Sequence, residues 1–558
     1  MIPFIVAVTG HRDLSVESIP TVAEAVRDVL LRYKDLMVNT EVVVVSALAE
    51  GADRLVAQTA LACNCKLWVL LPTEPKEYVK DFSSEESISE FKQLMECASE
   101  VINVPLKLGK AHNFHARPEI YVDTALVLGS LANLLVAVWD GNQEEKPGGT
   151  SQVVRLFRSG EYCIDNTSTI NQPFGGPVVH IACAREGNVG IKVSTHWLPI
   201  YKEPDQLIIE VDPFDRDQSI FCESLSMFDR LNGRLNQSTP NRIDRQDQKS
   251  TTDPKANTAD SRWTILFERM DYVSGAAQRY RVKNLIWIML SFVLFNLATL
   301  AYDGIAYGPL PLLIGILFLL VATLFYFIQR IKRIDELWVG SRAIAEFLRI
   351  SLSLISVGGK ALNPKKLIEE GLGRYDWITI SWKSIHSLSF LTSSRVDISE
   401  IEQRARLSEW CNGQVSYFEG QTSKILYHSK MAKRYQMTSA AAVFTALIVY
   451  LSILAFEILC SPRDSEQFRQ MSTWAIYLYW SLLSISAISA SVSYASGHNE
   501  HSANYRDAAT KFRLAIDKLP TAEGIMLHEI ARHLTDAASR ECIVWLKLHR
   551  ARPIKLPF

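Results

Sequence analysis

The stretch LIWIMLSFVLFNLATLAY, residues 285–302, carries no charged side chain, and neither does LPLLIGILFLLVATLFYFI, residues 310–328. A helix needs roughly 20 mostly apolar residues to cross about 30 Å of hydrocarbon. Two further apolar runs follow, at 438–460 with a single carboxylate and at 474–495 with many serines. Because the four runs lie in two close pairs, the sequence predicts four transmembrane helices in two hairpins. The alternative is four buried helices of a large soluble protein.

Basic residues flank the hairpins on the side away from their connecting loops. The loop at Asp303–Pro309 contains no lysine or arginine, and in the loop at Ser461–Thr473 two arginines are offset by two carboxylates. Basic residues instead precede the first hairpin, follow it and precede the second: Arg279, Arg281, Lys283, Arg330, Lys332, Arg333, Lys430, Lys433 and Arg434. Since cytoplasmic loops carry the excess of basic residues, we expect both termini and the central segment, Arg349–Gln436, to be cytoplasmic.

Similar segments surround the two hairpins. AQRY at 277–280 precedes the first hairpin and AKRY at 432–435 precedes the second, while RAIAEFLR at 342–349 and YRDAATKFR at 505–513 follow them. This indicates a duplicated unit of basic helix, hairpin and amphipathic helix, although amphipathic helices can also be alike by chance. We therefore expect an all-α membrane domain made of two repeated units, at 263–355 and 411–558, joined by a cytoplasmic segment at 356–410.

The N-terminal part has a different pattern. Segments with helical periodicity lie between short apolar runs that are typical of strands, namely Phe4–Thr9, Val42–Ala47, Lys66–Leu71, Val101–Val104, Leu134–Trp139 and Val178–Cys183. Alternating strands and helices predict an α/β Rossmann-like domain with a parallel, doubly wound sheet and ligands at the carboxyl ends of its strands. We assign residues 1–212 to this domain and 213–262, which includes a long polar run, to a flexible linker.

Three loops at the predicted strand ends favour a phosphate-bearing ligand. The first loop is a glycine turn after the first strand, and the second is a glycine turn directly before a helix. In the third loop, two glycines and a threonine precede another helix, where backbone N–H groups can bind an anion. An arginine in the first loop could pair with a phosphate. The candidate ligand residues are Gly10, His11, Arg12, Ser46, Glu50, Gly51, Asp53, Arg54, Asp140, Gly141, Gly148, Gly149 and Thr150.

The motifs VTGHRD, SALAEGADRLVA and VWDG with PGGT, within about residues 1–212, resemble the SLOG superfamily, which includes the LOG and DprA proteins. The membrane half resembles, less specifically, the SLATT-type effector modules of bacterial conflict systems, through its hairpin units and Glu541-x-x-x-Trp545. The resemblance implies a bacterial inner-membrane protein that binds a nucleotide or nucleotide-derived messenger, with no obligatory cofactor. The LOG catalytic glutamate is absent after Thr150, where Ser151 and Gln152 follow, so sensing is favoured over hydrolysis.

Composition and spacing argue against several other classes. With 59 basic and 60 acidic residues among 558, the net charge is −1, and no nucleic-acid partner is expected. Nine scattered cysteines suit a reducing cytosol, and the first residues lack the features of a signal peptide. His528 and His533 are five positions apart, on different faces of a helix. We therefore expect no metal site there.

The leading hypothesis is a sensor of a nucleotide-derived signal that permeabilises the membrane, in antiphage defence. The alternatives are a membrane-anchored nucleotide or nucleoside hydrolase, and a constitutive ion channel with a nucleotide-binding assembly domain. Ser486, Ser489 and Ser493 share one face of the fourth span, and with Asn296 they are candidates to line a pore. Small residues also let helices pack closely. Four spans enclose little space, so a pore implies a homo-oligomer, for example a tetramer, within membrane lipid.

Overall fold

The chain forms two compact units. The sheet domain comprises Met1–Arg262 and Ala361–Arg395, and the helical domain comprises Trp263–Lys360 and Val396–Phe558. The computed structural model describes residues 1–105, 117–142, 146–160, 175–186, 191–200, 216–238, 258–304, 309–357, 362–363, 367, 371–392, 399–460, 471, 473–476, 478–483, 486 and 498–551.

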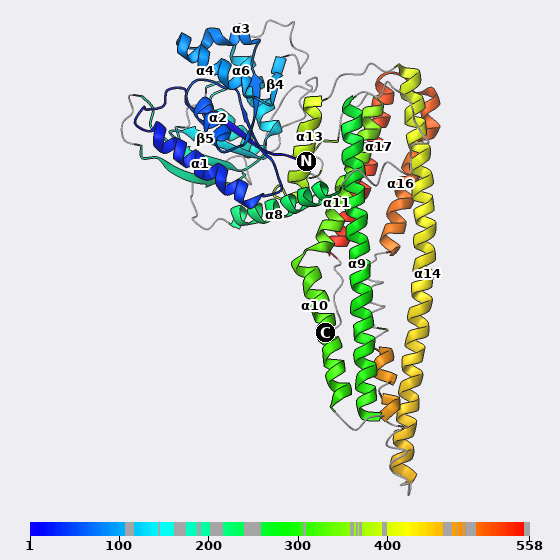
Figure 1. Ribbon diagram of the computed structural model, residues 1–558. Coiled ribbons are helices and arrows are strands. Elements are labelled where there is room, and N and C mark those ends of the chain that lie inside the picture. The colour runs from blue at the N-terminus through cyan, green and yellow to red at the C-terminus, as the bar shows by residue number, and fades with distance from the viewer. Residues whose placement is uncertain are drawn as a thin grey trace. The chain divides into compact units, whose positions relative to one another are not determined.

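The sheet domain, drawn mainly in blue and cyan in Figure 1, contains seven strands. Their order in the sheet is β4-β3-β2-β1-β5-β6-β7. Strands β1 to β6 are parallel, and β7 pairs antiparallel with β6. The bounds are β1 Phe4–Gly10, β2 Val42–Ser46, β3 Lys66–Leu71, β4 Glu100–Asn103, β5 Leu134–Trp139, β6 Val178–Ala182 and β7 Ser194–Leu198. All six predicted strands are confirmed. The seventh was not predicted, because STHWL is polar and only partly buried, as befits an edge strand.

Helices cover both faces of the sheet, since successive strand residues point to opposite sides. Helices α6 (Arg117–Leu131) and α7 (Thr150–Ser159) pack over one face, which presents Ala7 and Leu135. On the other face Leu67 and Val69 share a core with residues of α2 and α4. The remaining helices of this part are α1 Ile19–Leu36, α2 Ala52–Ala62, α3 Pro75–Tyr78, η1 Val79–Asp81 and α4 Glu85–Glu96.

Helix α8 (Arg216–Gln237) is an integral part of the sheet domain. Its buried residues recur at helical spacing, with Phe221 6.4 Å from the ring of Phe4 between centroids. The Asn232 amide accepts from Ile2 N at 3.1 Å and donates to Ile2 O at 2.9 Å. The predicted linker at 213–262 is therefore wrong over this helix, whose apolar face is covered by β1 and α1.

Helix α13 (Trp377–Thr392) also packs on the sheet domain, although in sequence it lies between the two hairpins. Its buried side chains include Trp377, Ile378 and Trp382, and it contacts α6 and α8. The sequence predicts only a connecting cytoplasmic segment at 356–410. The structure differs, because residues 361–395 complete the core of the sheet domain.

The helical domain contains the first predicted hairpin, the third predicted span and a bundle of further helices. Its elements are α9 Thr258–Gly304, α10 Leu310–Ile331, α11 Ile334–Ser356, α14 Glu400–Cys460, α16 His498–Lys518, η3 Leu519–Thr521 and α17 Ile525–Ala551. Residues of α11, α14, α16 and α17 share one apolar core, which includes Phe418 and Phe512. In the first hairpin, the Asn284 amide of α9 donates to Phe325 O of α10 at 3.0 Å.

Three helices of the described chain are long and apolar enough to cross a membrane, and they include Leu310–Ile331. Only 17%, 11% and 6% of their most apolar stretches are buried within the chain. Such exposure of large apolar side chains is costly in water and ordinary in lipid. The first three predicted spans fall in α9, α10 and α14, while most of the fourth, at 474–495, lies outside the described residues.

Two of the four pore candidates can be located. The Ser486 hydroxyl lies 3.1 Å from that of Ser439 on α14, a polar contact between two apolar segments. The Asn296 amide donates to Phe292 O of its own helix at 2.8 Å. Ser489 and Ser493 lie outside the described residues, so the pore face stays a prediction.

Candidate functional site

A cavity of about 450 Å³ opens at the carboxyl ends of β1 and β5. These two strands are neighbours in the sheet, and the chain continues from them in opposite directions, to β2 and to β6. This is the switch point at which open α/β sheets bind ligands. Eight of the thirteen predicted ligand residues line the cavity: Gly10, His11, Arg12, Asp53, Asp140, Gly148, Gly149 and Thr150.

The loop after β1 is held in place by its neighbours on both sides. His11 N donates to Val138 O of β5 at 3.0 Å, and Ala52 N at the start of α2 donates to His11 O at 2.9 Å. The His11 Nε2 atom lies 3.0 Å from Asp140 N and 3.1 Å from the Asp140 carboxylate, so it accepts from the first or donates to the second according to its protonation. These contacts fix the position of Arg12 at the cavity wall.

Gly51 allows the second loop to lie against the first. It adopts φ +79°, and a Cβ atom built there would lie 2.3 Å from Arg12 O and 2.5 Å from His11 O. No L side chain fits such an approach, so glycine is required by both conformation and space. Ser46 at the end of β2 is buried and accepts from Leu48 N at 3.0 Å. Both residues shape the cavity without lining it.

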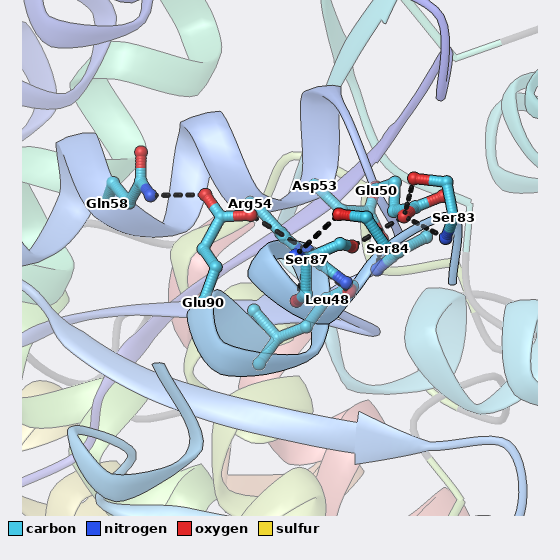
Figure 2. Close-up of polar contacts among 10 residues, drawn as sticks. Leu48, Glu50, Asp53, Arg54, Gln58, Ser83, Ser84, Ser87 and Glu90 are labelled. Atoms are coloured by element: carbon cyan, nitrogen blue, oxygen red, sulfur yellow. Dashed lines mark hydrogen bonds and ion pairs between the residues drawn. The ribbon is translucent and has the colours of Figure 1, made fainter. Parts of the chain in front are cut away.

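Glu50 and Arg54 were predicted ligand residues, but neither lines the cavity. Glu50 accepts hydrogen bonds from Ser83 N and Ser87 Oγ, near the start of α4. Arg54 donates to Leu48 O, Ser87 and Glu90, as Figure 2 shows. Burial raises the pKa of Glu50, yet the hydrogen bonds from Ser83 and Ser87 outweigh it and lower the pKa overall. This network joins α2 to α4.

The third loop opens α7 toward the cavity. Gly149 is the N-cap of this helix, and Gly149 N donates to Lys146 O at 2.8 Å. Gly148 N donates to the side chain of Gln152 at 2.7 Å. Thr150 and Ser151, whose N–H groups belong to the unpaired first turn of a helix, line the cavity, and this turn has no acidic residue. The loop can therefore hold an anion on backbone donors.

Two basic residues, Arg12 and Lys146, line the same cavity as this turn. Among the described residues, neither the Arg12 guanidinium nor Lys146 Nζ forms an ion pair, whereas Arg185 pairs with Asp13 at 2.8 Å. Arg12 lies 5.8 Å from the centroid of the Tyr121 ring. With the positive end of the α7 dipole, the wall formed by Arg12, Lys146 and α7 is electropositive and suited to phosphate.

The same cavity is also lined by acidic and aromatic side chains. Asp53, Asp140, Tyr78, Tyr121 and Trp139 line it. Carboxylates accept hydrogen bonds from hydroxyl or amino groups, and aromatic rings stack on flat ligands. A ligand with an anionic group and a polar ring system would match both kinds of lining residue.

Several lining residues were not predicted. Lys146 directly precedes the glycine loop, so its position in sequence was a usable signal. Tyr121 and Thr124 lie on α6 and reach the cavity only through the packing of that helix over β1. No local motif marks them. Gly141, which was predicted, has φ +83° and turns the chain away beside the cavity without lining it.

Asp53 is the most perturbed acid of the cavity. Burial raises the pKa of its carboxyl to about 7, while the Ala49 N–H and the charges of Arg12 and Arg54 only partly offset this. The Asp53 residue is only 7% exposed. It can therefore exchange a proton near neutral pH within a ligand-sized cavity, which is the behaviour expected of a functional group.

We expect the stability of the protein to depend on pH through Asp53. The pKa of Asp53 in the folded protein exceeds its unfolded value of 3.8. The protonated carboxyl therefore contributes its full share to the free energy of unfolding below about pH 4. This contribution falls as the pH rises from 4 to 7, by up to roughly 4 kcal/mol in total. Asp53→Asn removes this cost, so its Tm relative to wild type should be higher at pH 8 than at pH 5. Unfolding of the full chain in detergent measures this, with the exposed Asp28→Asn as control. An equal difference at both pH values would contradict it.

Comparison of the chain with models of protein families, with curated proteins and with solved structures found no match.

Proposed function

We propose that the sheet domain binds a nucleotide-derived ligand and that this binding controls the apolar helices within a membrane. The observation that carries the proposal is the wall formed by Arg12, Lys146 and the first turn of α7. It offers two cations and free backbone donors at a switch point, with aromatic rings nearby. A phosphate group would occupy the α7 turn, and a base would lie toward Tyr121 and Trp139.

The coupling to a membrane rests on the exposure of the three apolar helices. In the proposed arrangement they lie in lipid, and the sheet domain lies in the cytoplasm, where nucleotides are found. Ligand binding then shifts the helical domain toward a permeable state. A ligand can do this only if it binds the two states with different affinity.

The binding test uses the purified full chain in detergent. Mass spectrometry of small molecules released on denaturation should detect a phosphate-bearing compound, and calorimetry with ADP as probe should give a measurable Kd. Arg12→Gln removes a charge-assisted hydrogen bond worth about 1.5–3 kcal/mol, so the Kd should rise roughly 10- to 100-fold. The exposed Arg27→Gln on α1 should bind as wild type. Equal affinities for all three chains would remove Arg12 from the site.

A hydrolase is the second candidate, favoured by the His11–Asp140 pair and the protonatable Asp53 at one cavity. An imidazole oriented by a carboxylate is a common general base. Incubation of the full chain with ADP and product analysis separates the two functions. A sensor binds ADP without turnover, whereas a hydrolase releases products at a rate that Asp53→Asn lowers.

The proposed topology gives a separate prediction. A cysteine at Pro309, in the loop of the first hairpin, should react with a membrane-impermeant maleimide in intact cells. A cysteine at Ser423, exposed on α14 in the central segment, should not. Both are compared with the parent chain to subtract native cysteines. The charge asymmetry of the loops is the physical reason, and external labelling at Ser423 would overturn the orientation.

A further inference from the structure

Helices α9 and α14 each combine a charged part with an apolar part, and Figure 1 draws each as one continuous helix. The last basic residue before the apolar part is Lys283 in α9 and Arg434 in α14. Each follows another basic residue by four positions, Arg279 in α9 and Lys430 in α14. Because residues four apart lie on one face of a helix, each helix carries a pair of neighbouring cations at this boundary.

These two cation pairs are exposed and have no acidic neighbour on their own helix. All four side chains are exposed to solvent in the chain: Arg279, Lys283, Lys430 and Arg434. The sequence contains no Asp or Glu at 272–302 of α9 or at 420–456 of α14. In the part of the chain that the structure describes, none of the four forms an ion pair. Their charges are therefore available to an anion from outside the chain.

Other basic residues near the same boundary are neutralised within the helical domain. Arg281 Nε donates to Asp335 Oδ1 at 2.5 Å, and the guanidinium also lies 4.7 Å from the centroid of the Trp338 ring. Arg333 Nε donates to Glu336 Oε2 at 2.6 Å. Arg281 and Arg333 are both partly buried. The protein thus supplies carboxylates to these cations and leaves the exposed pairs without one.

An exposed apolar stripe continues from each cation pair along the same face of its helix. Its large side chains recur at helical spacing, so they lie in one row with the cations. They are Ile286, Leu290 and Leu297 after Lys283, and Met437, Phe444 and Ile448 after Arg434. A molecule that matches such a row has an anionic group at one end and hydrocarbon at the other. This is the chemistry of an acidic phospholipid.

On α9 the cation pair borders a hollow of about 290 Å³. Its lining among the described residues is Gln278, Arg279, Val282 and Lys283. This volume is close to the lower end of the range for small-molecule pockets, about 300 Å³. Trp287, one turn beyond Lys283, is 52% exposed, and its ring stacks on Phe325 of α10 at 6.3 Å. Tryptophan is enriched where a membrane meets water, so the hollow lies at the depth of lipid head groups.

We propose that the two cation pairs bind the phosphate groups of acidic phospholipids, whose acyl chains lie along the apolar stripes. The inference rests on the membrane part of the proposed function and adds the class of lipid. In each pair the arginine donates hydrogen bonds to phosphate oxygens, and the lysine adds a second charge. A zwitterionic head group brings its own cation and gains less from the pair. Each basic residue near a membrane surface raises the affinity for acidic lipid about fivefold.

The lipid retained by the purified chain tests this proposal. The full chain in detergent is equilibrated with equal amounts of phosphatidylglycerol and phosphatidylcholine that have the same acyl chains, and the retained lipid is measured by mass spectrometry. Wild type should retain at least tenfold more phosphatidylglycerol than phosphatidylcholine. The ratio should fall to within threefold of unity in a variant with four substitutions: Arg279→Gln, Lys283→Gln, Lys430→Gln and Arg434→Gln.

Two matched variants control for changes of charge and of side chain. Lys518→Gln with Arg532→Gln removes two exposed cations of α16 and α17, outside the three apolar helices, and should keep the wild-type ratio. Arg279→Lys with Lys283→Arg keeps both charges of the α9 pair and should stay within threefold of wild type. If the fourfold variant fails to fold, as judged by Tm, Arg279→Gln with Lys283→Gln should still lower the ratio at least threefold.

The outcomes separate this proposal from the proposed function. If wild type retains the two lipids equally, the acidic-lipid sites are overturned while the membrane location stands. An unchanged ratio in the folded variants that lack the cation pairs also overturns them. If wild type retains neither lipid and stays in solution without detergent, the membrane part of the proposed function fails, and the lipid sites fail with it. The Kd for ADP is measured on the same samples, so a failure of nucleotide binding is seen independently.

Discussion

A Gly51→Ala variant should lose roughly 4 kcal/mol or more of folding stability, enough to unfold the sheet domain under many conditions. The methyl group would meet the backbone oxygens of His11 and Arg12 at 2.5 and 2.3 Å, and φ +79° is itself unfavourable for alanine. Backbone atoms cannot yield as a flexible side chain can, so the first two loops of the site would separate. Circular dichroism and urea unfolding of the full chain in detergent measure the loss.

Gly141 provides the matched control for this prediction. It also has a positive φ, of +83°, but the nearest atom to an added Cβ is His180 Cε1 at 3.7 Å. Gly141→Ala therefore carries only the conformational cost, about 1–2 kcal/mol. If the two variants lost similar amounts of folding stability, the close approach of backbone oxygens to Gly51 would not contribute to the effect of Gly51→Ala.

A Gly149→Val variant should weaken ADP binding by roughly 100-fold or more while the domain stays folded. Gly149 has φ −76° and ψ 162°, which suit valine, and an added Cβ would lie 3.0 Å from Lys146 O, so the exposed turn at Lys146 must shift by a few tenths of an ångström. The side chain would occupy the space in which a phosphate approaches the backbone N–H groups of α7, and those donors are the main attraction at a helix N-terminus. Calorimetry gives the Kd, and thermal unfolding checks the fold.

Gly148→Val would not serve the same purpose. Gly148 has φ +72°, and a Cβ atom there would lie 2.6 Å from Tyr121 Cβ, so the substitution disturbs α6 as well as the cavity. Gly149→Ala is the better companion, since its smaller side chain should give an intermediate loss. A Gly149→Val protein with normal Tm and unchanged Kd would place the ligand elsewhere.

The sheet was predictable because each of its main strands is a short apolar run that can be recognised from the local sequence alone. Runs such as VVVVS at Val42–Ser46 are buried on both faces and bounded by turns, and parallel strands in an alternating chain leave few topologies. Since ligand sites occur at the carboxyl ends of such strands, the loops of Arg12 and Gly149 could be named as well.

The predictions that were wrong concern residues whose contacts lie far away in sequence. Helix α13 is bonded through Ser387 to a residue 256 positions earlier, a relation that no local pattern contains. The direction in which a side chain points also depends on distant residues. Glu50 accepts a hydrogen bond from Ser87, 37 positions later, and does not line the cavity. Helix α8 was assigned to a linker because most of its residues are polar and a polar run follows it. Its apolar residues lie on one face of the helix and are not adjacent in sequence.

The late position of α13 has a consequence for biosynthesis. When the ribosome has made residues 1–262, the sheet domain still lacks a helix that covers its core, and the next segments to emerge are the apolar helices α9 and α10. At about 5–20 residues per second, α13 is complete roughly 6–26 s later, after both of these apolar helices have been made. The sheet domain therefore completes its folding only after α9 and α10 have been made, and a chain arrested before residue 361 lacks the helix that covers its core.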